Sequence, residues 1–325
     1  MPLILLFHGG GNTALYTAQA TEWPLIAKEN GLIVVSVDLH HPNTTATETI
    51  DLIKHLQKEY PAIDPSRIYA NGFSMGGVKC WDLFEQYPEV FAGLAPMSAS
   101  FEVGVDSFNN PVENINTDVA VPVFYVGGEA SPLPELPFQE KRVINRISWT
   151  FKVNDVVADY TDPDFSVNNL WGINGDKIYT VEDTQYFKDS VLTVNLFKSS
   201  DGNYYTALAN SSNQSHEIYA RNSWAIWDFL KQFSRNTDGT ISINENQQPN
   251  IPEEPIVPDK PDVPDETATS EETNYRTYTV VKGDCLWVIA RKYLGSGFRY
   301  KEIMELNGLK SDIIHPNQVL RLPHK

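Results

Sequence analysis

Apolar runs alternate with helical periods along residues 1–233. Short continuous apolar runs predict buried strands; they lie at residues 3–7, 32–37, 67–70, 91–97 and 121–126. Apolar residues spaced three and four apart predict amphipathic helices between them; these segments are 21–30, 47–60, 75–87 and 218–233. Strands that alternate with helices are typical of a mostly parallel sheet with helices on both faces. The predicted fold class is therefore α/β.

Two later segments complete this first module. Residues 191–197 and 204–209 are strand-like, and Asp201-Gly202-Asn203 between them is a turn sequence typical of a β-hairpin. Residues 139–188 have no clean period. We predict that a segment of about 139–190 forms an insertion or cap over the edge of the sheet.

The apolar pattern stops after residue 235. Prolines then fall at every third position from Pro249 to Pro264, with acidic residues between them. Polyproline II has three residues per turn, so these 16 residues predict a semi-rigid spacer of roughly 50 Å at ~3.1 Å per residue. The predicted organisation is a domain at 1–235, a linker at 236–274 and a small domain at 275–325.

Charge and composition narrow the function classes. The net charge is −17; residues 1–233 carry 14 Lys and Arg against 28 Asp and Glu, whereas residues 275–325 carry 9 against 4. An acidic body disfavours nucleic acid as a partner, because phosphate binding needs clustered cations. No apolar run reaches the ~20 residues needed to span a membrane, and the start reads as a strand, not a signal peptide. The two cysteines are too few for a disulfide scaffold.

The sequence Gly72-Phe73-Ser74-Met75-Gly76 lies between a predicted strand and a predicted helix. At such a turn a serine adopts a strained backbone conformation, and small residues two positions before and after it prevent clashes. The hydroxyl then points out above the sheet at a helix N-terminus. We predict that Ser74 is a nucleophile.

A serine nucleophile needs a base and an acid that orients the base. Six of the seven histidines belong to other predicted elements or precede the nucleophile, which leaves His216 in the loop before the last helix. The order serine, acid, histidine holds for hydrolases with this kind of sheet. The acid is expected after the strand at 121–126. Glu129 directly follows Gly127-Gly128 and is preferred; Glu135 is the alternative, and the more distant candidates are Asp155 and Asp159.

A glycine run, His8-Gly9-Gly10-Gly11, follows the first strand. Backbone N–H groups of Gly10 and Gly11, together with the N–H of Met75, are candidates for an oxyanion hole. The spacing fits neither a phosphate-binding loop nor a dinucleotide fingerprint. No histidine–carboxylate cluster has metal-ligand spacing, so we expect no metal cofactor.

These motifs resemble the polyhydroxybutyrate-depolymerase-like and feruloyl-esterase-like branch of the α/β-hydrolases over about residues 3–235. The resemblance rests on the glycine run, the segment Ile63-Asp64-Pro65-Ser66-Arg67-Ile68-Tyr69 and the serine turn. It implies ester hydrolysis by Ser74, His216 and an acid. The family usually has aspartate as the acid and antiparallel strands before the first strand seen here. Their absence predicts a truncated chain or an internal start, with any signal peptide lost.

The segment from Tyr278 to Pro323 reads as strand, helix, helix, strand, and it resembles the LysM domain over its whole length. The resemblance implies βααβ topology and binding of N-acetylglucosamine-containing glycans such as peptidoglycan or chitin. In the family two loops form the glycan groove. They correspond here to Gly283, Asp284, Cys285 and Leu286, and to Ile313, Ile314, His315 and Pro316. Cys285 stands where threonine or serine is usual.

The sequence therefore predicts an extracellular or cell-wall-associated serine esterase without cofactors, attached to glycan by its LysM domain. Its substrate is an ester from a plant polysaccharide or a polyester. The alternatives are a peptidase on the same fold and a catalytically inactive glycan-binding surface protein.

Overall fold

The computed structural model describes residues 1–40, 44–106, 108–182, 189–247, 275–280, 286–294, 299–309, 314 and 318–323. The chain divides into two compact units, residues 1–258 and 259–325, and each is described by itself. The proline-rich part of the predicted linker lies outside the described residues. Among the residues described, no helix is long and apolar enough to cross a membrane.

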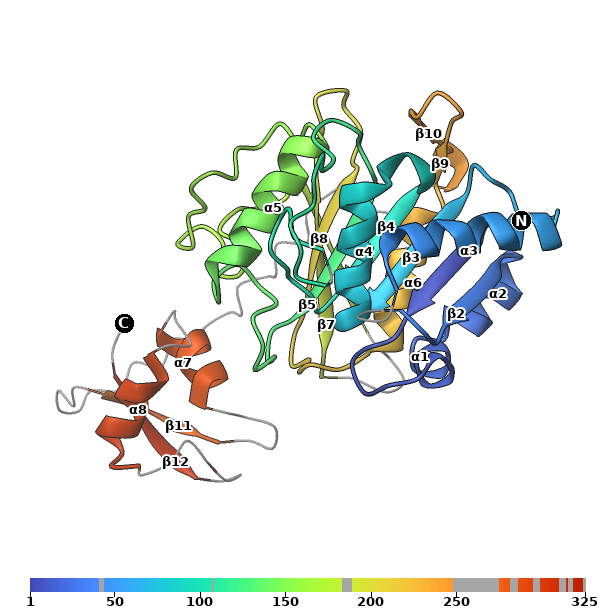
Figure 1. Ribbon diagram of the computed structural model, residues 1–325. Coiled ribbons are helices and arrows are strands. Elements are labelled where there is room, and N and C mark those ends of the chain that lie inside the picture. Colours follow the sequence, from blue (N-terminus) through green and yellow to red (C-terminus); the bar gives the residue numbers. More distant parts are fainter. Residues whose placement is uncertain are drawn as a thin grey trace. The chain divides into compact units, whose positions relative to one another are not determined.

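In the described part of the first unit, eight strands form one sheet in the order β2-β1-β3-β4-β5-β8-β7-β6 (Figure 1). The strands are β1 (Leu3–Phe7), β2 (Ile33–Val37), β3 (Ile68–Phe73), β4 (Gly93–Met97), β5 (Val123–Gly128), β6 (Lys177–Glu182), β7 (Val191–Phe197) and β8 (Thr206–Ser211). The pairings from β2 to β8 are parallel, whereas β7 is antiparallel to both of its neighbours. This is the predicted α/β-hydrolase type of sheet, and the predicted hairpin is β7–β8.

Helices cover both faces of this sheet, as the sequence predicts. One face carries α3 (Ala46–Glu59), α4 (Met75–Gln86) and α5 (Lys141–Val153); the other carries α2 (Trp23–Asn30) and α6 (Ala220–Leu230). In Figure 1, α4 crosses in front of the strands and α6 lies behind them. Each face has its own apolar core, because successive strand residues point to opposite sides. In β1, Leu5 joins the first core and Leu6 joins the second, which explains its unbroken apolar run.

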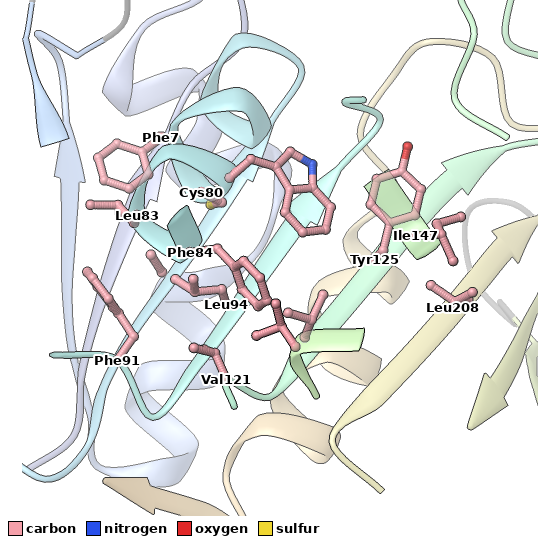
Figure 2. Close-up of a cluster of buried hydrophobic side chains, with 14 of the residues drawn as sticks. Phe7, Cys80, Leu83, Phe84, Phe91, Leu94, Val121, Tyr125, Ile147 and Leu208 are labelled. Atoms are coloured by element: carbon pink, nitrogen blue, oxygen red, sulfur yellow. The ribbon is translucent and has the colours of Figure 1, made fainter. Parts of the chain in front are cut away.

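The core beneath α4 contains the labelled side chains of Figure 2. Cys80 and Phe84 of α4 pack there with Phe7 of β1, Leu94 of β4 and Tyr125 of β5, and all five are at most 2% exposed. Burial of this kind contributes about 1.5–3 kcal/mol for each large apolar side chain. It fixes α4 rigidly against the strands whose carboxyl ends carry the predicted site.

The structure differs from the expectation for residues 139–190. Residues 141–153 form α5, whose Val143, Ile147 and Phe151 belong to the main core rather than to a separate cap. β6 does extend the edge of the sheet, by antiparallel pairing with β7. The short helix α1 (Ala14–Ala20), which the pattern also does not predict, begins after the glycine run.

The second unit has the predicted βααβ order. Its elements are β11 (Tyr275–Thr279), α7 (Leu286–Leu294), α8 (Tyr300–Leu306) and β12 (Val319–Pro323). β11 pairs antiparallel with β12, from Tyr275 opposite Pro323 to Thr279 opposite Val319. Eight buried apolar side chains form its core; they are Val280, Leu286, Ile289, Ala290, Leu294, Ile303, Leu320 and Leu322.

Candidate active site

Ser74 stands on a strained turn between β3 and α4. Its backbone has φ 53° and ψ −115°, a combination that costs a non-glycine residue free energy and is held only by its surroundings. The Ser74 N–H donates to the carbonyl of Met97 at the end of β4 (2.9 Å). The turn thus ties the serine to the carboxyl edge of the sheet.

Glycine is required on both sides of this turn. A Cβ on Gly72 would lie 2.0 Å from the carbonyl oxygen of Gly76, and a Cβ on Gly76 would lie 2.1 Å from that of Phe7. Both obstacles are backbone atoms, so a side-chain rotation cannot relieve them. Gly72 and Gly76 therefore let α4 start directly against β1 and β3.

His216 joins Ser74 to a buried carboxylate. Its Nε2 lies 2.9 Å from Ser74 Oγ and its Nδ1 lies 2.6 Å from Glu135 Oε1. Because a carboxylate accepts hydrogen bonds, Nδ1 carries the ring proton and leaves Nε2 free to accept the hydroxyl proton of Ser74. The imidazole also packs against the Phe73 ring, with centroids 4.9 Å apart. The geometry is that of a nucleophile, a base and an orienting acid.

Glu135 is completely buried and is surrounded by donors. Besides His216, the Ser131 hydroxyl donates to Oε1 (2.5 Å) and the Gly128 N–H donates to Oε2 (2.7 Å). The Tyr125 hydroxyl donates to the backbone carbonyl of Glu135 (2.7 Å). Burial, reinforced by the nearby Glu135 charge, raises the pKa of Tyr125 well above its usual range. The phenol therefore keeps its proton, and can donate it, above the pH at which an exposed tyrosine ionises.

The preference for Glu129 as the orienting acid is wrong in this geometry. The Glu129 N–H donates to the carbonyl of Ser211 (3.0 Å), which continues the pairing of β5 with β8. Its carboxylate accepts from the side chain of Asn210 (2.7 Å) instead of from His216. The chain then turns and brings the alternative candidate, Glu135, back to the end of β5.

The more distant acid candidates have local roles. Asp155 accepts a hydrogen bond from the Ser200 hydroxyl, and Asp159 accepts one from the N–H of Thr161 (2.9 Å). Neither contacts His216.

The described histidines other than His216 lie in other environments. The ring nitrogens of His8 lie near backbone carbonyl oxygens, Nδ1 2.8 Å from that of Gly9 and Nε2 2.9 Å from that of Asp38. His40 is buried beside it, with ring centroids 4.3 Å apart. His55 is exposed on α3.

The glycine run after β1 lies against the serine turn. A Cβ on Gly9 would lie 2.8 Å from the Phe73 ring, and one on Gly10 would lie 2.5 Å from the sulfur of Met75. Gly11 has φ +75°, a conformation that favours glycine. Met75 is the first residue of α4, where N–H groups have no partner within the helix. The predicted oxyanion-hole residues are thus brought to one place.

Three further features lie outside the Ser74 site: the predicted glycan groove, a cleft along α5 and the question of a metal site. Of the glycan-groove residues, Leu286 is buried at the start of α7 and Ile314 is half-buried; the other six lie outside the described residues. A cleft of about 530 Å³ runs along α5 and the segment 156–161, and no residue that lines it belongs to the Ser74 site. Within the described chain no three His, Cys, Asp or Glu side chains gather in a way that could hold a metal ion.

Sequence reasoning missed the residues that support Glu135. These are Ser131, Tyr125 and Gln139, whose side-chain oxygen accepts from the N–H groups of Glu135 (2.8 Å) and Leu136 (2.7 Å). The sequence does contain one feature that indicates this turn: prolines lie close together at positions 132, 134 and 137. Prolines in such density fix a turn, and a turn at this point is what returns the second glutamate to the strand end.

Comparison with known proteins agrees with this division into two units. Residues 278–323 match the family model of the LysM domain. Over 46 residues the chain is 50% identical to a probable peptidoglycan endopeptidase, LytE, of Bacillus subtilis. The matched stretch is 14% of this chain and 13% of that protein. The second unit is therefore a LysM domain.

A longer stretch resembles esterases. Over 137 residues the chain is 30% identical to a bifunctional acetylxylan esterase/xylanase, XynS20E, of Neocallimastix patriciarum. The matched stretch is 39% of this chain and 19% of that protein. Among solved structures, an acetyl xylan esterase from Aspergillus awamori aligns with 71% of this chain and 88% of its own, at 11% identity and a TM-score of 0.46. The chain spans less than one fifth of the length of either curated relative.

Proposed function

We propose that this protein is a serine esterase that removes acyl groups from a polysaccharide and that its LysM domain holds it on a glycan. The observation that carries the esterase proposal is the hydrogen-bonded series from Ser74 Oγ through His216 to buried Glu135. The strained turn under Ser74 and the adjacent glycine run support the same chemistry. Similarity to a relative described as an acetylxylan esterase supports the reaction class.

The proposed reaction follows from the geometry. Ser74 Oγ attacks the ester carbonyl while His216 Nε2 takes its proton, and the negative oxygen faces the N–H groups of Met75, Gly10 and Gly11. His216 then gives the proton to the leaving alkoxide, so the alcohol departs and an acyl-Ser74 ester remains. Water then attacks that ester while the same imidazole takes its proton; His216 gives this proton to Ser74 Oγ as the acyl bond breaks, which releases the carboxylic acid and restores the serine hydroxyl. Glu135 stabilises the imidazolium in both steps.

The proposed substrate is an acetyl or feruloyl ester on a plant polysaccharide. The motifs of the hydrolase unit support placing it in the feruloyl-esterase-like and polyhydroxybutyrate-depolymerase-like branch of the fold. Acetyl release is the first choice, because the relative with 30% identity over 137 residues is described as a bifunctional acetylxylan esterase/xylanase. The resemblance to polyhydroxybutyrate-depolymerase-like hydrolases suggests short polyesters as a second substrate class.

The proposed partner of the LysM domain is a glycan that contains N-acetylglucosamine, as in peptidoglycan or chitin. Support comes from the LysM match and from similarity to a probable peptidoglycan endopeptidase. A cell-wall-bound or extracellular location follows from that partner. We propose the loops around Asp284 and Ile314 as the contact surface.

Hydrolysis of p-nitrophenyl esters of increasing acyl length tests the esterase proposal. The full chain should release p-nitrophenol from the acetate well above the buffer rate, and Ser74→Ala should abolish the difference. Acetylated xylan, feruloylated arabinoxylan and a short polyester then identify the natural ester. If the full chain and Ser74→Ala both match buffer on every ester, the protein is a glycan-binding protein without this activity. Cleavage of peptides in place of esters would make it a peptidase.

A further inference from the structure

The loop between β5 and α5 contains a second hydroxyl that touches the candidate active site. Ser131 Oγ lies 2.5 Å from Glu135 Oε1, the same oxygen that accepts from His216 Nδ1. We infer that Ser131 is a positioning residue: its hydroxyl fixes the Glu135 carboxylate and shares the negative charge that faces His216. This inference deepens the proposed function and rests on it.

The burial of Glu135 explains why such a donor is needed. A carboxylate with no exposure to water is unfavourable unless hydrogen bonds replace the lost solvation. His216 supplies one donor from Nδ1. The Gly128 N–H and the Ser131 hydroxyl supply two more, to Oε2 and Oε1 respectively. The Gly128 donor is a backbone N–H, which a side-chain substitution does not remove. The Ser131 hydroxyl is therefore the donor that a substitution can test.

Ser131 is itself held in place. Its N–H donates to the carbonyl of Gly128 (3.3 Å), its Oγ accepts from the N–H of Leu133 (3.1 Å), and only 8% of the residue is exposed. Since the Leu133 N–H occupies an acceptor position on Oγ, the hydroxyl proton is directed to Glu135. The side chain therefore acts as a donor of defined orientation.

Gln139 provides a matched control from the same loop. Its side-chain oxygen accepts from the N–H groups of Glu135 and Leu136, and its amide donates to the carbonyl of Ser131 (3.3 Å). It stabilises the loop backbone but makes no contact with the Glu135 carboxylate. Loss of Gln139 should loosen the loop, whereas loss of the Ser131 hydroxyl should change the charge felt by His216.

The expected effect has a definite sign. Without the Ser131 donor, more negative charge remains on Oε1, which favours the protonated imidazolium of His216. The imidazolium form is inactive, because a protonated Nε2 cannot accept the Ser74 proton. The acid limb of the pH profile should therefore move to higher pH.

The test compares full-length wild type, Ser131→Ala and Gln139→Ala on p-nitrophenyl acetate. For Ser131→Ala we expect kcat/KM to fall roughly 10- to 100-fold, the range for one hydrogen bond to a charged group, with the acid limb displaced upward. Gln139→Ala should lower the melting temperature while its acid limb stays with that of wild type. Coincident acid limbs for Ser131→Ala and wild type, or equal displacement in Gln139→Ala, would overturn the inference.

Two further measurements keep the test decisive. If Ser131→Ala does not fold, Ser131→Cys replaces it, because it retains the shape of the side chain with a weaker donor. Ser131→Cys should displace the acid limb in the same direction. The Nδ1 proton of His216, observed by NMR in the full chain, should shift in the Ser131 variants and not in Gln139→Ala. This signal needs no turnover. An inactive wild type whose signal behaves in this way would therefore refute the esterase proposal while supporting the role of Ser131; an unmoved signal would refute that role.

Discussion

At the scale of single residues, the proposed reaction makes Ser74 and His216 one proton-transfer unit, because His216 Nε2 lies 2.9 Å from the Ser74 hydroxyl whose proton it would take. We predict that Ser74→Ala and His216→Ala each lower kcat by at least about 10³-fold. The double variant should be hardly worse than either single one. Steady-state kinetics on one ester measures all three. Losses that multiply would show that the two residues do not share a step.

The acid is predicted from geometry to be Glu135, not Glu129. Glu135→Gln keeps the size of the side chain but presents a neutral amide to His216, so we expect a loss of kcat of roughly 10³- to 10⁴-fold, as for an orienting acid. Glu129→Gln is the matched control, since its carboxylate contacts Asn210, and it should stay within about ten-fold of wild type. The reverse order of the two losses in kcat would return the role to Glu129.

This acid also shows where sequence reasoning stops. Ser74 and His216 could be chosen from the chain because the serine turn has a local glycine signature and because few histidines competed. Two glutamates six positions apart after one strand have no such difference. Their roles are decided by hydrogen bonds that close the loop. The Gly128 N–H donates to the Glu135 carboxylate, and the N–H groups of Glu135 and Leu136 donate to the side-chain oxygen of Gln139. Those contacts exist only once the loop is folded.

At the scale of elements, the contact between α4 and β1 depends on Gly76. We predict that Gly76→Ala lowers the free energy of unfolding by about 3 kcal/mol, because the added methyl would meet the rigid carbonyl of Phe7 at 2.1 Å. Gly10→Ala is the control: its methyl would meet the flexible end of Met75, so a smaller loss is expected. Chemical denaturation compares them. Equal losses would mean that α4 shifts freely against the sheet.

Most strands and helices could be predicted from their periods, and α5 shows why one of the exceptions could not. Its buried positions Val143, Ile147 and Thr150 do have helical spacing. Arg146, however, lies on the same buried face, where it pairs with Glu85 (2.6 Å) and stacks over Trp81. A charged residue among apolar ones breaks the amphipathic pattern. Only the partner on α4, 61 positions earlier, explains how that charge is buried.

At the scale of the whole molecule, the two units have separate apolar cores. The described contacts of Ser74, His216 and Glu135 lie within the first unit. The net charge also differs, because residues 275–325 carry 9 Lys and Arg against 4 Asp and Glu, whereas the chain as a whole is acidic. The two functions proposed for the units can therefore be separated by truncation.

Removal of residues 275–325 is predicted to leave kcat/KM on p-nitrophenyl acetate unchanged within about two-fold and to abolish co-sedimentation with peptidoglycan or chitin. The same residues fused to an inert carrier should restore co-sedimentation.

Salt then separates two causes of binding. Attraction of a positively charged domain to anionic wall polymers weakens as salt rises, because exposed charges are screened within ~8–10 Å. Binding that persists in salt indicates recognition by the groove loops, and sedimentation of the truncated hydrolase unit would contradict the anchoring role.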